Sequence, residues 1–148
     1  MRVYVASSWR NTRQPEVVER LRAAGHEVYD FRHPAPGHDG FRWSEIDPDW
    51  QQWSPAAFID ALEHPIAQRG FFFDLVALRA CQACVLVEPA GRSAHLELGY
   101  AAGACKRTVI LLADGEPELM YRLADVLCPT LDEVVAALSP AAHTEVRS

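Results

Sequence analysis

The chain has 148 residues, of which 49% are hydrophobic and 23% charged, and its formal net charge is −6. This length fits one globular domain that can bury a hydrophobic core without disulfides or a structural metal. The acidic balance argues against binding to nucleic acid polymers or anionic membranes, which require a basic face. No apolar run reaches the roughly 20 residues of a membrane-spanning helix, and no signal-peptide stretch is visible, so we expect a cytoplasmic protein.

The charge is unevenly distributed along the chain. Residues 1–25 contain five Arg and two Glu, a local balance of +3, whereas residues 26–70 and 71–148 carry −5 and −4. The positive N-terminal segment is therefore a candidate for contact with an anionic group.

Four cysteines raise the question of metal or redox chemistry. Cys81 and Cys84 form a C-x-x-C pattern, but Cys84 opens the apolar run CVLVEP, which is typical of a buried strand. A zinc site would need a second close pair, and a thioredoxin-type site would place the pattern at the start of a helix. We expect buried, reduced cysteines and neither a metal nor an organic cofactor.

The first elements predict a strand–helix–strand unit. Residues 2–6 (RVYVA) form an apolar, β-rich run, and helical spacing of apolar residues follows from Pro15 until Gly25 ends the helix. Residues 26–31 (HEVYDF) are the next strand, so the unit has the length of a βαβ motif. Residues 32–54, rich in Pro, Gly and Trp, form a long inserted loop of the kind that is often functional.

The remaining elements alternate in the same way. The pattern predicts helices over 54–65 (capped by Ser54), over 71–83 after Gly70, from Ser93 onward, over 117–127 and over 131–139. Strands are expected over 83–89 and 108–113, with a short edge strand near 126–127. This order predicts one α/β domain over residues 1–139, a flavodoxin-like three-layer sandwich with about five parallel strands, and a flexible tail over 140–148.

Ligands of open parallel sheets bind at the carboxyl ends of the strands. Residues 88–97 follow the predicted central strand. There Gly91 permits a turn, Ser93 can cap the helix, and Glu97 lies one turn inside it. The positive end of the helix dipole is expected to keep Glu97 ionised, as a nucleophile requires. The alternative is an acid that only complements the helix dipole.

Several motifs resemble one enzyme family across residues 3–125. These are VYVASSWR at the start, an Asp before the central strand, E-P-x-G, and H-L-E-L-G-Y-A. Together they are similar to the nucleoside 2-deoxyribosyltransferases, including the 2'-deoxynucleoside 5'-monophosphate N-glycosidases. The resemblance implies cleavage of an N-glycosidic bond through a covalent glycosyl-enzyme on Glu97, because this residue matches the Glu of the family's E-L-G motif.

The resemblance also implies roles for two neighbours of this Glu. Asp74 matches the family's Asp that contacts the base and helps to protonate it, and Tyr4 matches the Tyr that orients the nucleophile. The chemistry is consistent, since an oxocarbenium-like state needs a carboxylate and a departing base needs a proton. The alternatives are an acid at the start of a helix for Asp74 and a core side chain for Tyr4.

A phosphate-binding end is implied near the positive segment. Ser8 and Arg10 match the family's contacts to a 5'-phosphate, and Arg92 and Ser93 could add to that site. A solvated loop is the simpler explanation for any one of these residues.

Two positions depart from the family pattern. Gly91 stands where the family often has Asp or Ser, and Glu118, two residues before Met120, stands where it usually has Asn or Ser. In the family the residue at position 118 reaches the 5' end of a substrate in a neighbouring subunit, so the resemblance implies a homodimer. Because a carboxylate repels phosphate, the choice between a free nucleoside and its monophosphate stays open.

The insert could supply an aromatic lid. Trp43 or Trp50 could stack on the base, or these side chains could cover the apolar surface of the following helix. The sequence therefore predicts an enzyme that acts on a small nucleoside or nucleotide, and transfer and hydrolysis share the covalent step. The alternatives are a hydrolase of another nucleotide such as NAD, and a non-catalytic nucleotide-binding module.

Overall fold

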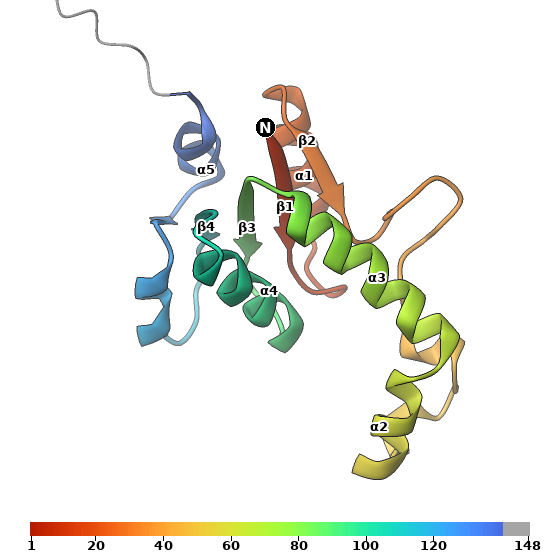
Figure 1. Cartoon of the computed structure of the whole chain (residues 1–148). Coiled ribbons are helices and arrows are strands. Elements are labelled where there is room, and N and C mark those ends of the chain that lie inside the picture. The colour runs from red at the N-terminus through yellow and green to blue at the C-terminus, as the bar shows by residue number, and fades with distance from the viewer. Residues whose placement is uncertain (141–148) are drawn as a thin grey trace, which may run out of the picture.

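The computed structural model describes residues 1–140, and at its centre is a sheet of five parallel strands (Figure 1). The strands are β1 (Arg2–Ala6), β2 (Glu27–Asp30), β3 (Ala83–Val87), β4 (Arg107–Leu111) and β5 (Val126–Cys128). Their order across the sheet is β2-β1-β3-β4-β5. This is the flavodoxin-like order, and it confirms the predicted fold class.

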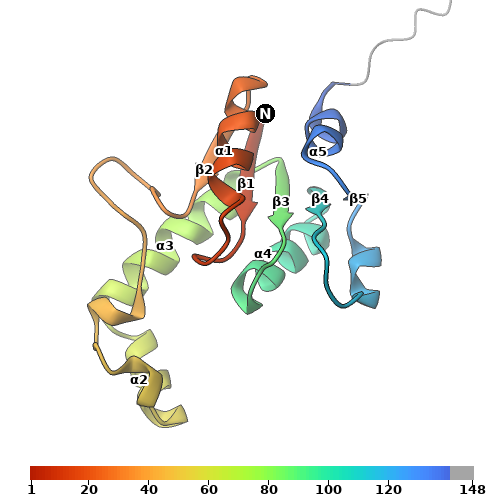
Figure 2. The ribbon, with the colours of Figure 1, turned by 180° about the vertical axis from the view of Figure 1, so that it is seen from behind.

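Helices cover both faces of the sheet, as the two opposite views show (Figures 1 and 2). On one face, α1 (Gln14–Ala23) and α5 (Leu131–Leu138) bury Val3, Val5 and the apolar residues that share their side of the strands. On the other face, α3 (Pro65–Ala80) and α4 (Arg92–Gly103) pack over Tyr4 and Ala6. Successive strand residues point to opposite faces, so β1 contributes to both hydrophobic clusters.

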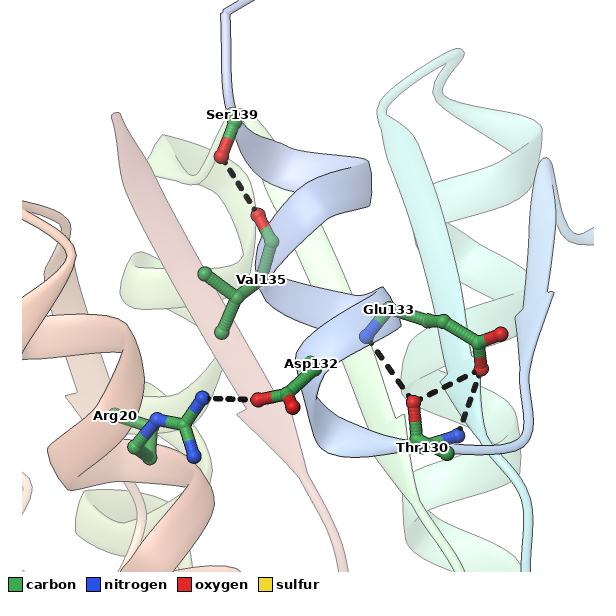
Figure 3. A network of polar contacts seen from close by, with 6 residues as sticks. All are labelled: Arg20, Thr130, Asp132, Glu133, Val135 and Ser139. Carbon is green, nitrogen blue, oxygen red and sulfur yellow. Dashed lines mark hydrogen bonds and ion pairs between the residues drawn. The ribbon is translucent and has the colours of Figure 1, made fainter.

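The last helix is fixed at both ends (Figure 3). Thr130 caps it by accepting from the Glu133 backbone N at 3.3 Å, and the Glu133 carboxylate accepts from the Thr130 backbone N at 2.9 Å. This reciprocal capping box satisfies two amides that the helix itself leaves free. An ion pair from Arg20 to Asp132 links α5 to α1, and the Ser139 hydroxyl donates to the Val135 carbonyl at 2.9 Å.

The middle helices differ from the prediction in their boundaries. Ser54 caps α2 (Pro55–Leu62) as expected, by accepting from the Ala57 backbone N at 3.1 Å, but α2 ends before the predicted position 65. The next helix starts at Pro65 and runs through Gly70. A Cβ at Gly70 would lie 2.8 Å from the Cβ of Phe41. Gly70 therefore allows the insert to pack on α3 and does not mark a helix start.

The insert over residues 32–54 contains two short 3₁₀ turns, η1 (Trp43–Glu45) and η2 (Trp50–Gln52), and an isolated antiparallel bridge between Ala35 and His38. It is attached to the loop after β1, because the indole of Trp9 donates to the Phe41 carbonyl at 3.1 Å and the Arg42 guanidinium lies 4.1 Å from the centre of the Trp9 ring. Together with α2, the insert extends away from the sheet (Figure 2).

The predicted helix over 117–127 is wrong. The chain forms the short 3₁₀ helix η3 (Leu119–Leu123) and then enters β5, which confirms the expected edge strand. Asp125 explains the break, because its carboxylate accepts from the Thr108 backbone N at 2.8 Å and from the Thr108 hydroxyl at 3.1 Å. These bonds bring Asp125 to the start of β4, so a helix cannot continue through it.

All four cysteines are free thiols, and three are buried as expected, whereas Cys105 is exposed. Within residues 1–140, no group of three or more His, Cys, Asp or Glu side chains could hold a metal ion. In that same range, none of the helices combines the length and hydropathy needed to cross a membrane. Apart from its first residue, the predicted tail over 140–148 lies outside the described residues.

Candidate active site

Tyr4 lies at the centre of the sheet face that α3 and α4 cover. It pairs in register with Tyr29 on β2 and with Cys84 on β3, and its side chain is fully buried. Its hydroxyl does not reach hydrogen-bond geometry with any group of residues 1–140, but it lies close enough to Glu97 for that carboxylate to affect its pKa. Burial, followed by the charges of Glu97 and Asp74, raises the pKa of Tyr4 strongly. Packing alone would need only an apolar side chain at this position, so a buried hydroxyl near two carboxyl groups favours a role in the site over a purely structural one.

Asp74 lies in the middle of α3, whose first residue is Pro65. The alternative of an acid at the start of a helix is therefore wrong, because that alternative depended on a helix beginning after Gly70. The Tyr29 hydroxyl donates to Asp74 Oδ1 at 2.8 Å. Burial raises the pKa of Asp74, and the hydrogen bond from Tyr29 opposes this effect.

Glu97 lies in the second turn of α4. The helix begins at Arg92 with Gly91 as its N-cap residue, and Ser93 makes no capping hydrogen bond, contrary to the prediction. Because the helix field decays within the first turn, it does not keep Glu97 ionised. Burial, followed by the charge of Asp74, raises the pKa of Glu97 to about 8, although Tyr4 acts in the opposite direction. The predicted effect of the helix dipole on Glu97 is thus wrong, since desolvation outweighs it.

Tyr4, Asp74 and Glu97 come from β1, α3 and α4, and the charge of Asp74 raises the pKa of both Tyr4 and Glu97. Two carboxyl groups whose charges interact in a partly buried site resist ionising together. Between the pKa of Asp74 and that of Glu97, near 8, the pair therefore holds a single proton. One member can act as an acid while the other acts as a nucleophile.

Ser8 and Arg10 lie in the loop that leaves β1. The Ser8 hydroxyl accepts from the Arg10 backbone N at 3.2 Å, and the Arg10 side chain is exposed and available to a ligand. Arg32 stabilises this loop, because its Nη2 atom donates to the carbonyls of Ser8, Trp9 and Asn11 at 3.3, 3.1 and 2.8 Å. Nothing in the sequence pattern indicates this role for Arg32, which depends on the position of the chain after β2.

Two further loop residues join the carboxyl ends of three strands. Asn11 Nδ2 donates to the carbonyls of Val87 at 3.0 Å and Pro89 at 3.1 Å, and Arg13 Nη1 donates to the Leu112 carbonyl at 3.1 Å. The loops after β1, β3 and β4 are therefore fixed to one another. This agrees with the expectation that ligand-binding segments of an open parallel sheet lie at the carboxyl ends of its strands.

A chain of polar contacts lies beside the start of α4. The Tyr121 hydroxyl donates to the Glu88 carboxylate, and the His95 ring contacts Tyr121 Oη at 3.0 Å and the Gly91 carbonyl at 2.7 Å. This chain ties η3 to the loop that carries Gly91. An open hollow of about 630 Å³ is lined here by Ala90, Gly91, Arg92, His95 and Leu96. The sequence pattern gives no role to His95, because it lies two residues before Glu97 and therefore on a different face of the helix.

Trp43, Glu118 and Met120 are not seen in contact with the carboxylate pair. Trp43 packs edge-to-face against Phe41, Trp53 and Phe58, with ring centres 4.7 to 5.7 Å apart, which is the packing expected if it covers α2. Glu118 caps η3 by accepting from the Met120 backbone N at 2.9 Å. The Met120 side chain is exposed. The lid role of Trp43 and the substrate contacts of Glu118 and Met120 stay predictions.

Comparisons with known proteins establish the fold. No protein-family model and no curated protein matches the chain. Among solved structures, a 2-deoxyribosyltransferase from the psychrotolerant bacterium Bacillus psychrosaccharolyticus is similar, with a TM-score of 0.57 and 18% identity over 91% of this chain and 90% of that one. A CMP N-glycosidase from Clostridium botulinum is also similar, with a TM-score of 0.51 and 18% identity over 93% of this chain and 98% of that one. The α/β fold that the sequence motifs implied is therefore confirmed.

Proposed function

We propose that the protein cleaves the N-glycosidic bond of a nucleoside or its 5'-monophosphate, with 2'-deoxyribose as the expected sugar. The bond is broken through a covalent glycosyl-enzyme on Glu97, and the sugar passes to a second base or to water. The two solved structures named above are enzymes of this kind of chemistry by name, one a transferase and the other an N-glycosidase.

The observation that carries the proposal is the partly buried carboxyl pair. Asp74 and Glu97 come from two helices on one face of the sheet, and each has a tyrosine hydroxyl beside it. Cleavage of a C1'–N bond needs a nucleophile on one side of the sugar and a proton donor for the departing base. A pair that shares one proton provides both groups.

The proposed reaction runs in two steps. It starts from the form of the pair in which the shared proton, held mainly by Glu97 because Asp74 ionises first, has moved to Asp74. In the first step, ionised Glu97 bonds to C1', the C1'–N bond breaks, its electron pair goes to the base nitrogen, and Asp74 gives its proton to the base. In the second, water or another base attacks C1' and its proton passes to Asp74, which frees Glu97. The Tyr4 hydroxyl beside Glu97 favours the ionised form of Glu97 and orients it.

The 5' end of the substrate is proposed to lie against Ser8, Arg10, Gly91 and Ser93. Arg10 is exposed in a fixed loop, and the first amides of α4 lie beside Gly91, which together suit an anion. We also propose a homodimer in which Glu118 and Met120 approach the partner's site. Large exposed side chains on α4 and η3 support this proposal, with Leu96 and Leu119 exposed by 76% and 78%.

The proposal is tested by a base-release panel. The protein is incubated with 2'-deoxynucleosides, ribonucleosides, their 5'-monophosphates and NAD, and free base is measured by chromatography. We expect release from at least one deoxynucleoside or deoxynucleoside monophosphate, and exchange when a second free base is added if the enzyme is a transferase. Release from NAD alone would favour the hydrolase of another nucleotide, and no release from any compound would contradict the proposal.

The shared proton predicts a bell-shaped dependence of kcat/KM on pH. At acidic pH both carboxyl groups are protonated, so Glu97 cannot attack. As pH rises through the pKa near 8, the pair loses its remaining proton and the base can no longer be protonated. Initial rates between pH 4 and pH 10 should therefore fall on the alkaline side with an apparent pKa of about 8. A rate that keeps rising to pH 10 would show that no shared proton is needed.

A further inference from the structure

Tyr29 contacts Asp74, one member of the carboxyl pair, although the sequence pattern marks it only as a strand residue. It lies directly beside Tyr4 in the register of β1 and β2, and the two rings stack with centres 5.1 Å apart at 23°. Its hydroxyl donates to Asp74 Oδ1 at 2.8 Å across 45 positions of the sequence. Asp74 is the hydrogen-bond partner of this hydroxyl within residues 1–140.

The position of the Tyr29 hydroxyl is set by the sheet. Tyr29 is anchored in a parallel ladder, its side chain is half-buried, and its ring rests on the fully buried ring of Tyr4. A donor on a strand is held more precisely than one on a loop. The Asp74 carboxyl is therefore held in one orientation before any ligand arrives.

The two oxygens of Asp74 are not equivalent in this arrangement. Oδ1 accepts the hydrogen bond from the Tyr29 hydroxyl. When the carboxyl group is protonated, its proton is therefore best placed on Oδ2. We propose, on the basis of the function proposed above, that Tyr29 is a positioning residue that fixes Asp74 so that Oδ2 delivers its proton to the leaving base. Tyr29 itself neither gains nor loses a proton in the reaction.

The Tyr29→Phe variant tests this role because it keeps the stacked ring and removes only the hydroxyl. We expect kcat for the nucleoside substrate to fall by about 10- to 100-fold, since one hydrogen bond to an ionisable group is lost. The p-nitrophenyl glycoside of the same sugar has a leaving group that needs no proton. Its rate should change by less than about threefold. Tyr100→Phe, at an exposed position on α4, is the matched control.

A pH profile and a double mutant provide independent readouts. Without the phenol, burial alone acts on Asp74, so its pKa rises and the acidic limb of the nucleoside profile, which this pKa sets, moves to higher pH. In an Asp74→Asn background, the Tyr29 change should cost nothing further, because the hydroxyl acts through Asp74.

Each outcome of these assays has a defined meaning. Equal losses on both substrates would overturn the inference, because a structural role would slow both reactions. If the wild-type protein is active and the Tyr29→Phe variant turns over the nucleoside equally fast, the inference is also overturned, while the proposed function stays intact. If the wild-type protein releases neither base nor p-nitrophenol, the proposed function itself fails and the inference fails with it.

Discussion

The Glu97→Gln protein should lose base release by at least about 1,000-fold and, above pH 8, unfold at a higher temperature than the wild type. The activity falls because an amide cannot form the glycosyl ester with C1'. The gain in stability follows because the amide has no charge that the fold must bury beside Asp74.

The sign of the stability effect follows from the pKa of Glu97, which is about 8 in the folded chain against an ordinary value of 4.5. Between these pH values the folded state keeps a proton that the unfolded state has released, so Glu97 destabilises the fold increasingly as pH rises. Near pH 4.5 and below, Glu and Gln should behave alike. At pH 9 the variant should be more stable by on the order of 5 kcal/mol, or roughly 15 °C in Tm.

Thermal melts at pH 4.5 and pH 9, together with base-release rates, check both parts. Glu19→Gln, an exposed position on α1, is the matched control and should change neither quantity. A variant that retains wild-type rates would remove Glu97 from the mechanism. A variant that melts lower than the wild type at pH 9 would show that ionised Glu97 is stabilised in the fold.

The Asp74→Asn protein should release base from nucleosides about 100- to 10,000-fold more slowly than the wild type. Its activity on the p-nitrophenyl glycoside should stay within about threefold, because p-nitrophenolate leaves without a proton. The loss of the Asp74 charge also lowers the pKa of Glu97, since that charge is one of the two causes that raise it. The acidic limb of p-nitrophenol release should therefore move to lower pH.

Initial rates measured with the nucleoside and with the p-nitrophenyl glycoside distinguish a loss of proton donation from a loss of the fold. Asp60→Asn changes an exposed acid on α2 and provides the control. If Asp74→Asn slows both substrates to the same extent, Asp74 is not the proton donor and supports the site in another way.

Local pattern predicts the sheet well because each strand is a short buried run between turn residues. Pattern fails where distant residues decide the local structure. The apolar residues of 117–127 have helical spacing, yet the hydrogen bonds from Thr108 to Asp125 end any helix there. Gly70 is typical of a helix boundary, but it lies inside α3. A glycine is needed there because Phe41 packs so closely against α3 that a Cβ would clash with it.

The site was only partly predictable for the same reason. The motif around Glu97 locates the carboxylate, but its pKa depends on burial and on Asp74, which comes from another helix. Tyr29 could not be recognised from sequence, because its contact with Asp74 needs both the strand register and the rotation of α3. Neither the strand register nor the rotation of α3 can be derived from composition and local motifs.

The central claim, a covalent glycosyl-enzyme on Glu97, can be measured by mass spectrometry after reaction with a slow 2'-fluoro nucleoside analogue. Trypsin releases residues 93–106 as one peptide, between Arg92 and Lys106, and Glu97 is the only acidic residue in it. We predict that this peptide gains the mass of the fluorinated sugar and that the Glu97→Gln protein shows no such gain. Steady release of base with the sugar on another peptide would contradict the assignment.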